Sequence, residues 1–154
     1  MTLWDPTQTL LNVKAALQNS AYNFNVVQIG EPMSPPTDLT VAFWLHDMEP
    51  VQVTLNDTID VWTIMVRIYT RAGMTPQDLQ SAELALALGV SQVEAALGGG
   101  FTLGGTVRAI DWVGEEQGHR VSVRWGHVVI SGTIFKVADW FVPVIVDDSV
   151  QFVA

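Results

Sequence analysis

The chain has 154 residues, 49% of them hydrophobic and 15% charged, and a formal net charge of −9 at pH 7, so its length suits a single domain, residues 1–154, around one core. The acidic balance opposes the phosphate neutralisation that drives nucleic-acid affinity, and no apolar run approaches the ~20 residues that span a bilayer, so we expect neither tight DNA binding nor a membrane role. The absence of cysteine excludes disulfides and thiolate metal sites, and suits a protein made in the cytoplasm.

The N-terminal part of the chain predicts one short helix and two strands. Asp5 and Pro6 are typical of a helix start, because aspartate caps the first backbone amides and proline fits the first helical position. Apolar residues at helical spacing then predict a helix over residues 6–19. Residues 25–29 and 39–45 read as strands, and the three prolines between them indicate a stiff surface loop.

The middle of the chain predicts a long loop, a strand and a long helix. Residues 46–57 are mostly polar and are expected to form a long excursion that includes a short extended piece over residues 51–55. Residues 60–69 alternate apolar and polar side chains, which predicts a strand with one buried face. Thr75 is expected to cap an amphipathic helix that ends at Gly98, and Gly89 inside it predicts a kink or the close approach of another backbone.

The C-terminal part predicts further strands joined by glycine-rich turns. Residues 106–113 and 119–125 are expected to pair as a hairpin around the turn 114–118. Residues 141–146 are expected to form the last strand, and Pro143 within it argues for a sheet edge or a bulge.

This order of elements predicts an α+β fold, with a mostly antiparallel twisted sheet and two helices packed on one of its faces. The strands are rich in Trp, Val and Ile on both sides. We therefore expect the opposite sheet face to be covered by a neighbouring subunit or by later strands of the same chain.

No pattern in the chain points to catalysis. The three histidines, His46, His119 and His127, have no second ligand at helical spacing, which argues against a metal site. No serine lies in a nucleophile elbow, and the glycine cluster after the long helix lacks the position and the lysine of a phosphate loop. We expect no enzyme and no cofactor. A small-ligand-binding domain is the alternative, but it needs a convergent polar cluster that the pattern does not reveal.

The order and character of several segments resemble the tail terminator proteins of long-tailed bacteriophages. The similar pieces are residues 25–30 with the proline loop that follows, Ile64-Met65-Val66-Arg67-Ile68-Tyr69, the helix from Thr75, Leu103-Gly104-Gly105-Thr106-Val107-Arg108 and the closing strands.

The resemblance implies a structural virion protein that forms a hexameric ring. Such a ring caps the tail tube, terminates tail polymerisation and gives head and neck proteins a docking surface. The implied partners are further copies of the chain, the tail tube protein and the head-neck connector or stopper protein, while DNA passes through the lumen without specific binding. Another neck or tail-completion protein, such as a stopper or connector, is the alternative within the same context.

The residues that carry such a function would lie on surfaces. Loops are the expected contacts with tube or neck, arginines are candidate donors of ion pairs between subunits, and two tryptophans are candidates for an interface. The interface candidates are His46, Asp47, Glu49, Asn56, Asp57, Arg67, Arg71, Arg108, Glu115, Glu116, Trp44 and Trp112.

Overall fold

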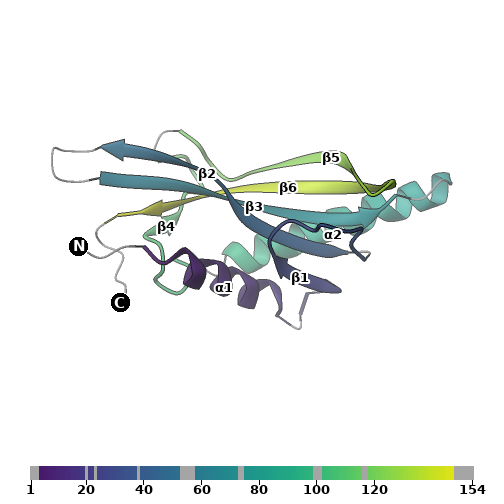
Figure 1. Ribbon diagram of the computed structural model, residues 1–154, viewed down its shortest axis with the longest axis horizontal. Coiled ribbons are helices and arrows are strands. Elements are labelled where there is room, and N and C mark those ends of the chain that lie inside the picture. Colours follow the sequence, from purple (N-terminus) through teal and green to yellow (C-terminus); the bar gives the residue numbers. More distant parts are fainter. Residues whose placement is uncertain are drawn as a thin grey trace.

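The computed structural model describes residues 4–19, 21–22, 24–37, 39–52, 58–72, 75–98, 102–115 and 118–147. These residues form two helices and one curled, mixed sheet, which confirms the predicted α+β class (Figure 1). The elements are α1 Pro6–Leu17, β1 Val26–Ile29, β2 Thr40–Gln52, β3 Thr58–Arg71, α2 Pro76–Gly98, β4 Ala109–Ile110, β5 Ser122–Ile130 and β6 Thr133–Val146. The strand order is β1-β2-β3-β6-β4, and β5 also pairs with β6.

Both predicted helix starts are confirmed by their caps. The Asp5 carboxylate accepts hydrogen bonds from the first backbone amides of α1, at 3.0 and 3.4 Å. At α2, Thr75 Oγ1 accepts from the Asp78 amide at 3.1 Å, while Asp78 Oδ2 accepts from the Thr75 amide at 3.3 Å. This reciprocal pair satisfies two donors that a helix start otherwise leaves unpaired.

The prediction that residues 46–57 leave the sheet is wrong for residues 46–50, while the extended piece expected from residue 51 matches the end of β2. Strand β2 continues to Gln52 and pairs with the start of β3, through a register shift between Leu45 and Asp47. Its polar side chains hid the strand, because this part of the hairpin carries exposed residues rather than an apolar alternation. Residues 53–57 lie outside the described part.

The predicted C-terminal hairpin is also wrong. Strand β5 pairs with β6, which begins at Thr133 rather than at residue 141, and the two are joined by a two-residue turn. The turn residues Ser131 and Gly132 have φ angles of 49° and 81°, as a type I′ turn requires. Gly126 lies within β5.

Pro143 lies inside the sheet rather than at an edge. Its carbonyl accepts a hydrogen bond from the Asp111 amide at 2.8 Å, so its nitrogen also faces the β4 and β5 side of β6. Pairing with β5 ends at Phe141 and pairing with β4 begins at Val144. The N–H that Pro143 lacks would therefore point between the part of β6 that pairs with β5 and the part that pairs with β4.

Both helices pack on one face of the sheet, as predicted. Helix α2 crosses β3 and β6, and α1 packs against α2 and β1. A Cβ at Gly89 would lie 3.3 Å from Ile68 Cγ2 and 3.5 Å from the Phe24 ring, so the predicted close approach is to side chains rather than to another backbone. Among the described residues, neither helix has the length and apolar character needed to cross a membrane.

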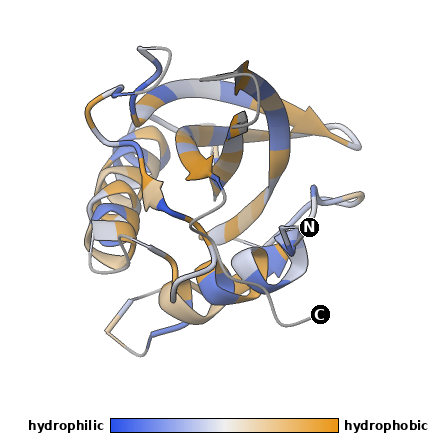
Figure 2. Ribbon diagram, turned by 90° about the vertical axis from the view of Figure 1, so that its left-hand side faces the viewer, coloured by the Kyte–Doolittle hydropathy of each residue, from blue (hydrophilic) through white to orange (hydrophobic). Residues whose placement is uncertain are grey.

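The sheet curls strongly, as the view along it in Figure 2 shows. The main core lies between the helices and the sheet, and a smaller cluster lies on the opposite face around Tyr69 and Phe135. Val128 and Ile130 of β5 pack against this second cluster. Strand β5 belongs to the same sheet, so these side chains extend the second face, and what covers that face stays a prediction.

Candidate functional surfaces

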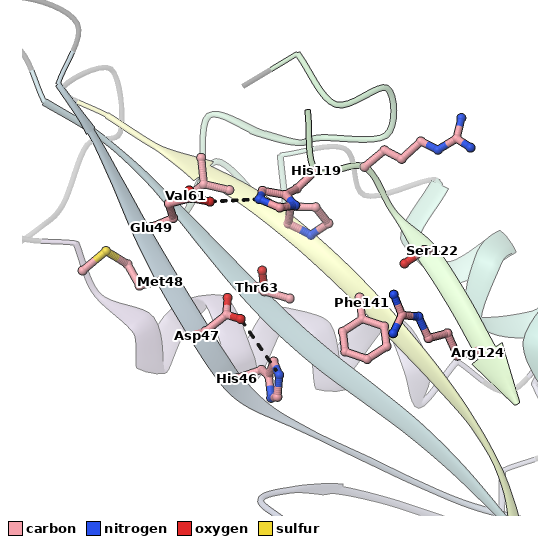
Figure 3. A pocket seen from close by; sticks show the side chains of 12 residues that line it. His46, Asp47, Met48, Glu49, Val61, Thr63, His119, Ser122, Arg124 and Phe141 are labelled. Carbon is pink, nitrogen blue, oxygen red and sulfur yellow. Dashed lines mark ion pairs between the residues drawn. The ribbon is translucent and has the colours of Figure 1, made fainter. Parts of the chain in front are cut away.

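A cavity of about 410 Å³ lies on the sheet face opposite the helices, at the root of the β2–β3 hairpin (Figure 3). Its lining side chains come from β2, β3, β6, the start of β5 and the segment that leads into β5. They are His46, Asp47, Met48, Glu49, Val61, Thr63, His119, Arg120, Ser122, Arg124, Phe141 and Pro143.

Opposite walls of this cavity carry opposite charges. On the β2 side, Glu49 Oε2 lies 3.1 Å from His119 Nε2, and Asp47 Oδ2 lies 3.9 Å from His46 Nε2. On the β5 side, the Arg124 guanidinium lies 5.3 Å from the centre of the Phe141 ring. Figure 3 shows the Asp47 and Arg124 groups on either side of the cavity.

This convergence corrects the expectation that the chain lacks a polar cluster. Residues 46–49 and 119–124 belong to segments on either side of β3 and β6, and the curl of the sheet brings them together. No local pattern could have revealed this proximity. Among the described residues, no group of three or more His, Asp or Glu is placed to hold a metal ion. The lining itself offers charged and aromatic side chains as binding groups.

Arg67 lies on the same sheet face and is held by groups of its own chain. Its Nε and Nη2 donate to the Asp139 carboxylate at 2.6 and 3.0 Å, and its guanidinium lies 5.6 Å from the Trp44 ring centre. The hydrogen bond to Asp139 raises the pKa of Arg67 above its usual value. Glu31 Oε1 lies 3.9 Å from Arg67 Nη1. Two of the predicted interface residues, Arg67 and Trp44, therefore contact each other in one partly buried cluster.

Arg108 is likewise paired within the chain. Its Nη1 donates to Asp147 Oδ2 at 2.9 Å, and its Nη2 lies 4.0 Å from Glu115 Oε1. Arg71 ends β3 and is exposed. A contact of any of these arginines with a neighbouring subunit stays a prediction.

Of the remaining candidates, one packs against the core and three lie in the undescribed part. Trp112 is half-buried and packs edge-on against Trp140, with ring centres 6.4 Å apart. Asn56, Asp57 and Glu116 lie outside the described residues.

A second set of exposed apolar side chains, which we call the helix-side patch, has two parts, one on the outer side of α2 and one on the helix side of β5 and β6. Leu84 and Leu88 on α2 are 63% and 51% exposed, and Trp125, Val129 and Ile134 on β5 and β6 are 44%, 65% and 52% exposed. Sequence reasoning missed this patch as a site. The sequence signal that could have revealed it is the presence of leucines on α2 outside the row of residues that face the sheet.

The sequence matches no protein-family model and no curated protein.

Proposed function

We propose that this protein is the tail terminator of a long-tailed bacteriophage. Six copies form a ring that caps the tail tube, ends tube polymerisation and presents a docking surface to the head-neck connector or stopper protein. The resemblance in the order of segments supports this proposal, and so do the surfaces of the described residues. The protein would act as a structural part of the virion rather than as an enzyme.

The observation that carries the proposal is the projecting β2–β3 hairpin. The last pair between β3 and β6 joins Asp60 to Val146, but β2 and β3 continue to pair with each other as far as Gln52 and Thr58. Figure 1 shows this hairpin at one end of the molecule. Two residue pairs, Val51–Ile59 and Gln52–Thr58, lie beyond the end of β6, and Met48, Glu49 and Pro50 of β2 are exposed just before them. This exposed end of the hairpin offers a contact for the tube or the neck.

The acidic composition fits a ring through which DNA passes. A negatively charged wall repels phosphate groups, so DNA can slide without binding. We propose that the lumen carries part of the net charge of −9. A map of the assembled ring with a basic lumen would refute this placement.

Deletion of the gene from its phage tests the proposal. Without the protein, tails should lack a defined upper length and should fail to join heads, and supplying the gene in trans should restore both properties. Tails of normal length that fail only to join heads would instead indicate a stopper or connector. Normal tails and normal joining would refute the proposal.

The cavity at the hairpin root favours a second candidate, a small-ligand-binding domain. Its carboxylates, guanidinium groups and aromatic floor suit a ligand that carries both charges, such as a free amino acid. A rise in melting temperature with L-arginine or L-glutamate, lost in Arg124→Ala, would support this candidate. Unchanged melting with such ligands would count against it.

A further inference from the structure

Helix α2 is apolar on two opposite sides. Ala82, Leu86 and Val93 are buried against the sheet, whereas Leu84 and Leu88 lie one helical turn apart on the outer side and are more than half exposed. A helix with apolar residues on both sides is typical of a position between two packed layers. The described chain provides only one of these layers.

The sheet has an apolar area at β5 that neither α1 nor α2 covers. Helix α2 packs over β3 and β6. Val123 at the start of β5 still packs against the main core, whereas the helix-side residues further along β5 lack an equivalent cover. Trp125 and Val129 point to this face, opposite Ala138 and Ile134 of β6. Trp125, Val129 and Ile134 all remain at least 44% exposed. The helix layer therefore ends before it reaches the edge of the sheet.

The two uncovered surfaces differ in charge. Residues 76–98 of α2 include Asp78, Glu83 and Glu94 but no Lys, Arg or His. The helix side of β5 and the neighbouring part of β6 carry His127 and Lys136 but no Asp or Glu, whereas the arginines near β5 line the cavity on the opposite face. Charges around an apolar contact orient two partners and disfavour contacts between like surfaces. Two α2 helices would repel each other, whereas the helix side of β5 presents no acidic group that would repel α2.

One ion pair within the chain already joins α2 to this end of the sheet. Lys136 of β6 donates a hydrogen bond to Glu83 of α2. Lys136 lies opposite His127 of β5, so this ion pair is located at the border between the covered and the uncovered strands.

We propose that the outer side of α2 in one copy packs on the uncovered face of β5 in the next copy. The α2 helix of the neighbour would lie beside the resident helices and complete the layer on that face. Such a head-to-tail contact joins two different surfaces, so every copy can use both, and the chain of contacts closes into a ring when the rotation allows. This inference rests on the proposed ring and assigns its subunit contact.

Two single variants test the contact by light scattering of the purified full-length protein. Leu88→Glu disrupts only the α2 side, and Val129→Glu disrupts only the β5 side. Each variant should weaken self-association about tenfold or more and give a monomer where the wild type gives a ring. Leu11→Glu is the matched control, because Leu11 is an exposed leucine of α1 that lies outside the patch; it should assemble like the wild type.

Mixing the two variants gives the decisive result. The Leu88→Glu copy retains an intact β5 surface, and the Val129→Glu copy retains an intact α2 surface, so an equimolar mixture should form a heterodimer and nothing larger. Circular dichroism melting checks that both variants fold. A mixture that stays monomeric, variants that assemble like the wild type, or a wild type that is monomeric at every concentration would overturn the inference.

These outcomes are distinct from failure of the proposed function. A wild type that assembles through this contact but leaves tail length unaffected in the phage would retain the inference and refute tail termination. Variants that cap tails normally although the contact is disrupted would retain the function and refute the contact.

Discussion

Arg67 and Asp139 lie directly opposite each other on β3 and β6, joined by hydrogen bonds of 2.6 and 3.0 Å, and each side chain is only 17% exposed. The planar guanidinium matches the carboxylate with two parallel bonds, which fixes the relative position of the two strands. The stacking of Arg67 near Trp44 adds a contact from β2. This cluster therefore ties together three neighbouring strands on the face opposite the helices.

Removal of the Asp139 carboxylate should destabilise the protein markedly. Asp139→Ala leaves the Arg67 charge partly buried without its main partner, and we expect the free energy of unfolding to fall by about 2–3 kcal/mol. Urea unfolding at pH 7 measures this loss. Asp47→Ala, which removes a carboxylate from a much more exposed pair with His46, should cost less than about 0.5 kcal/mol. Equal losses for both variants would contradict the structural role of the Arg67–Asp139 pair.

The stability of the protein should fall steeply at alkaline pH because of Tyr69. Burial raises the pKa of the Tyr69 hydroxyl, with the Arg67 charge opposing, and the hydroxyl has no hydrogen-bond partner among the described residues. The unfolded chain releases this proton near pH 10, whereas the folded chain retains it. The contribution of the neutral Tyr69 to the free energy of unfolding is therefore fully present below about pH 10 and is lost as the pH rises further.

Tyr69→Phe isolates this contribution from other alkaline effects. The variant should match the wild type near pH 8 and lose less free energy of unfolding between about pH 10 and pH 11. Urea unfolding at each pH provides the comparison. Parallel losses in both proteins would show that Tyr69 does not carry the pH dependence.

The tip of the β2–β3 hairpin should be dispensable for folding and required for docking. Residues 52–58 can be replaced by Asn-Gly between Val51 and Ile59, which pair with each other; Pro50 is unsuitable as a flanking residue because it lacks the N–H that closes a two-residue turn. The shortened protein should melt within about 3 °C of the wild type, since ~1 kcal/mol shifts a domain of this size by a few degrees. Its binding to tail tubes, measured by co-sedimentation, should be lost. Unimpaired co-sedimentation would remove the hairpin tip from the docking surface.

Gly89 should tolerate no large side chain, although it lies within a helix. Gly89→Leu would drive the new side chain into Ile68 and Phe24, and we expect a loss of about 2 kcal/mol from overpacking. Ala87→Leu is the matched control, because Ala87 is exposed on the same helix and should be near neutral. Thermal melting compares them. A fully stable Gly89→Leu protein would contradict the close packing of α2 on β3.

Local signals in the sequence were sufficient for the helices but not for the sheet. Asp5 and Thr75 cap the helices through neighbours two to three residues away, so their patterns are complete within a short window. The start of β6 has no such local signal, because its register is set by pairing with β3. Arg67 and Asp139, for example, are 72 residues apart. Polar β2 residues beyond Leu45 form a strand only because β3 pairs with them.

The candidate surfaces could likewise be predicted only where the residues involved are close together in the sequence. Sequence reasoning named His46, Asp47 and Glu49, but it assigned them to a loop and had no means of placing His119 beside Glu49. It also named arginines that the structure pairs within the chain. The helix-side patch was missed because exposure depends on where α2 ends its coverage of the sheet, which is a property of tertiary packing.

Electron microscopy of tail tubes incubated with the purified protein tests tail termination most directly. The expected result is a six-fold ring at one end of each tube, together with arrested elongation at that end when tube protein is added. Bare tube ends at saturating protein, with elongation unchanged, would contradict the proposed function.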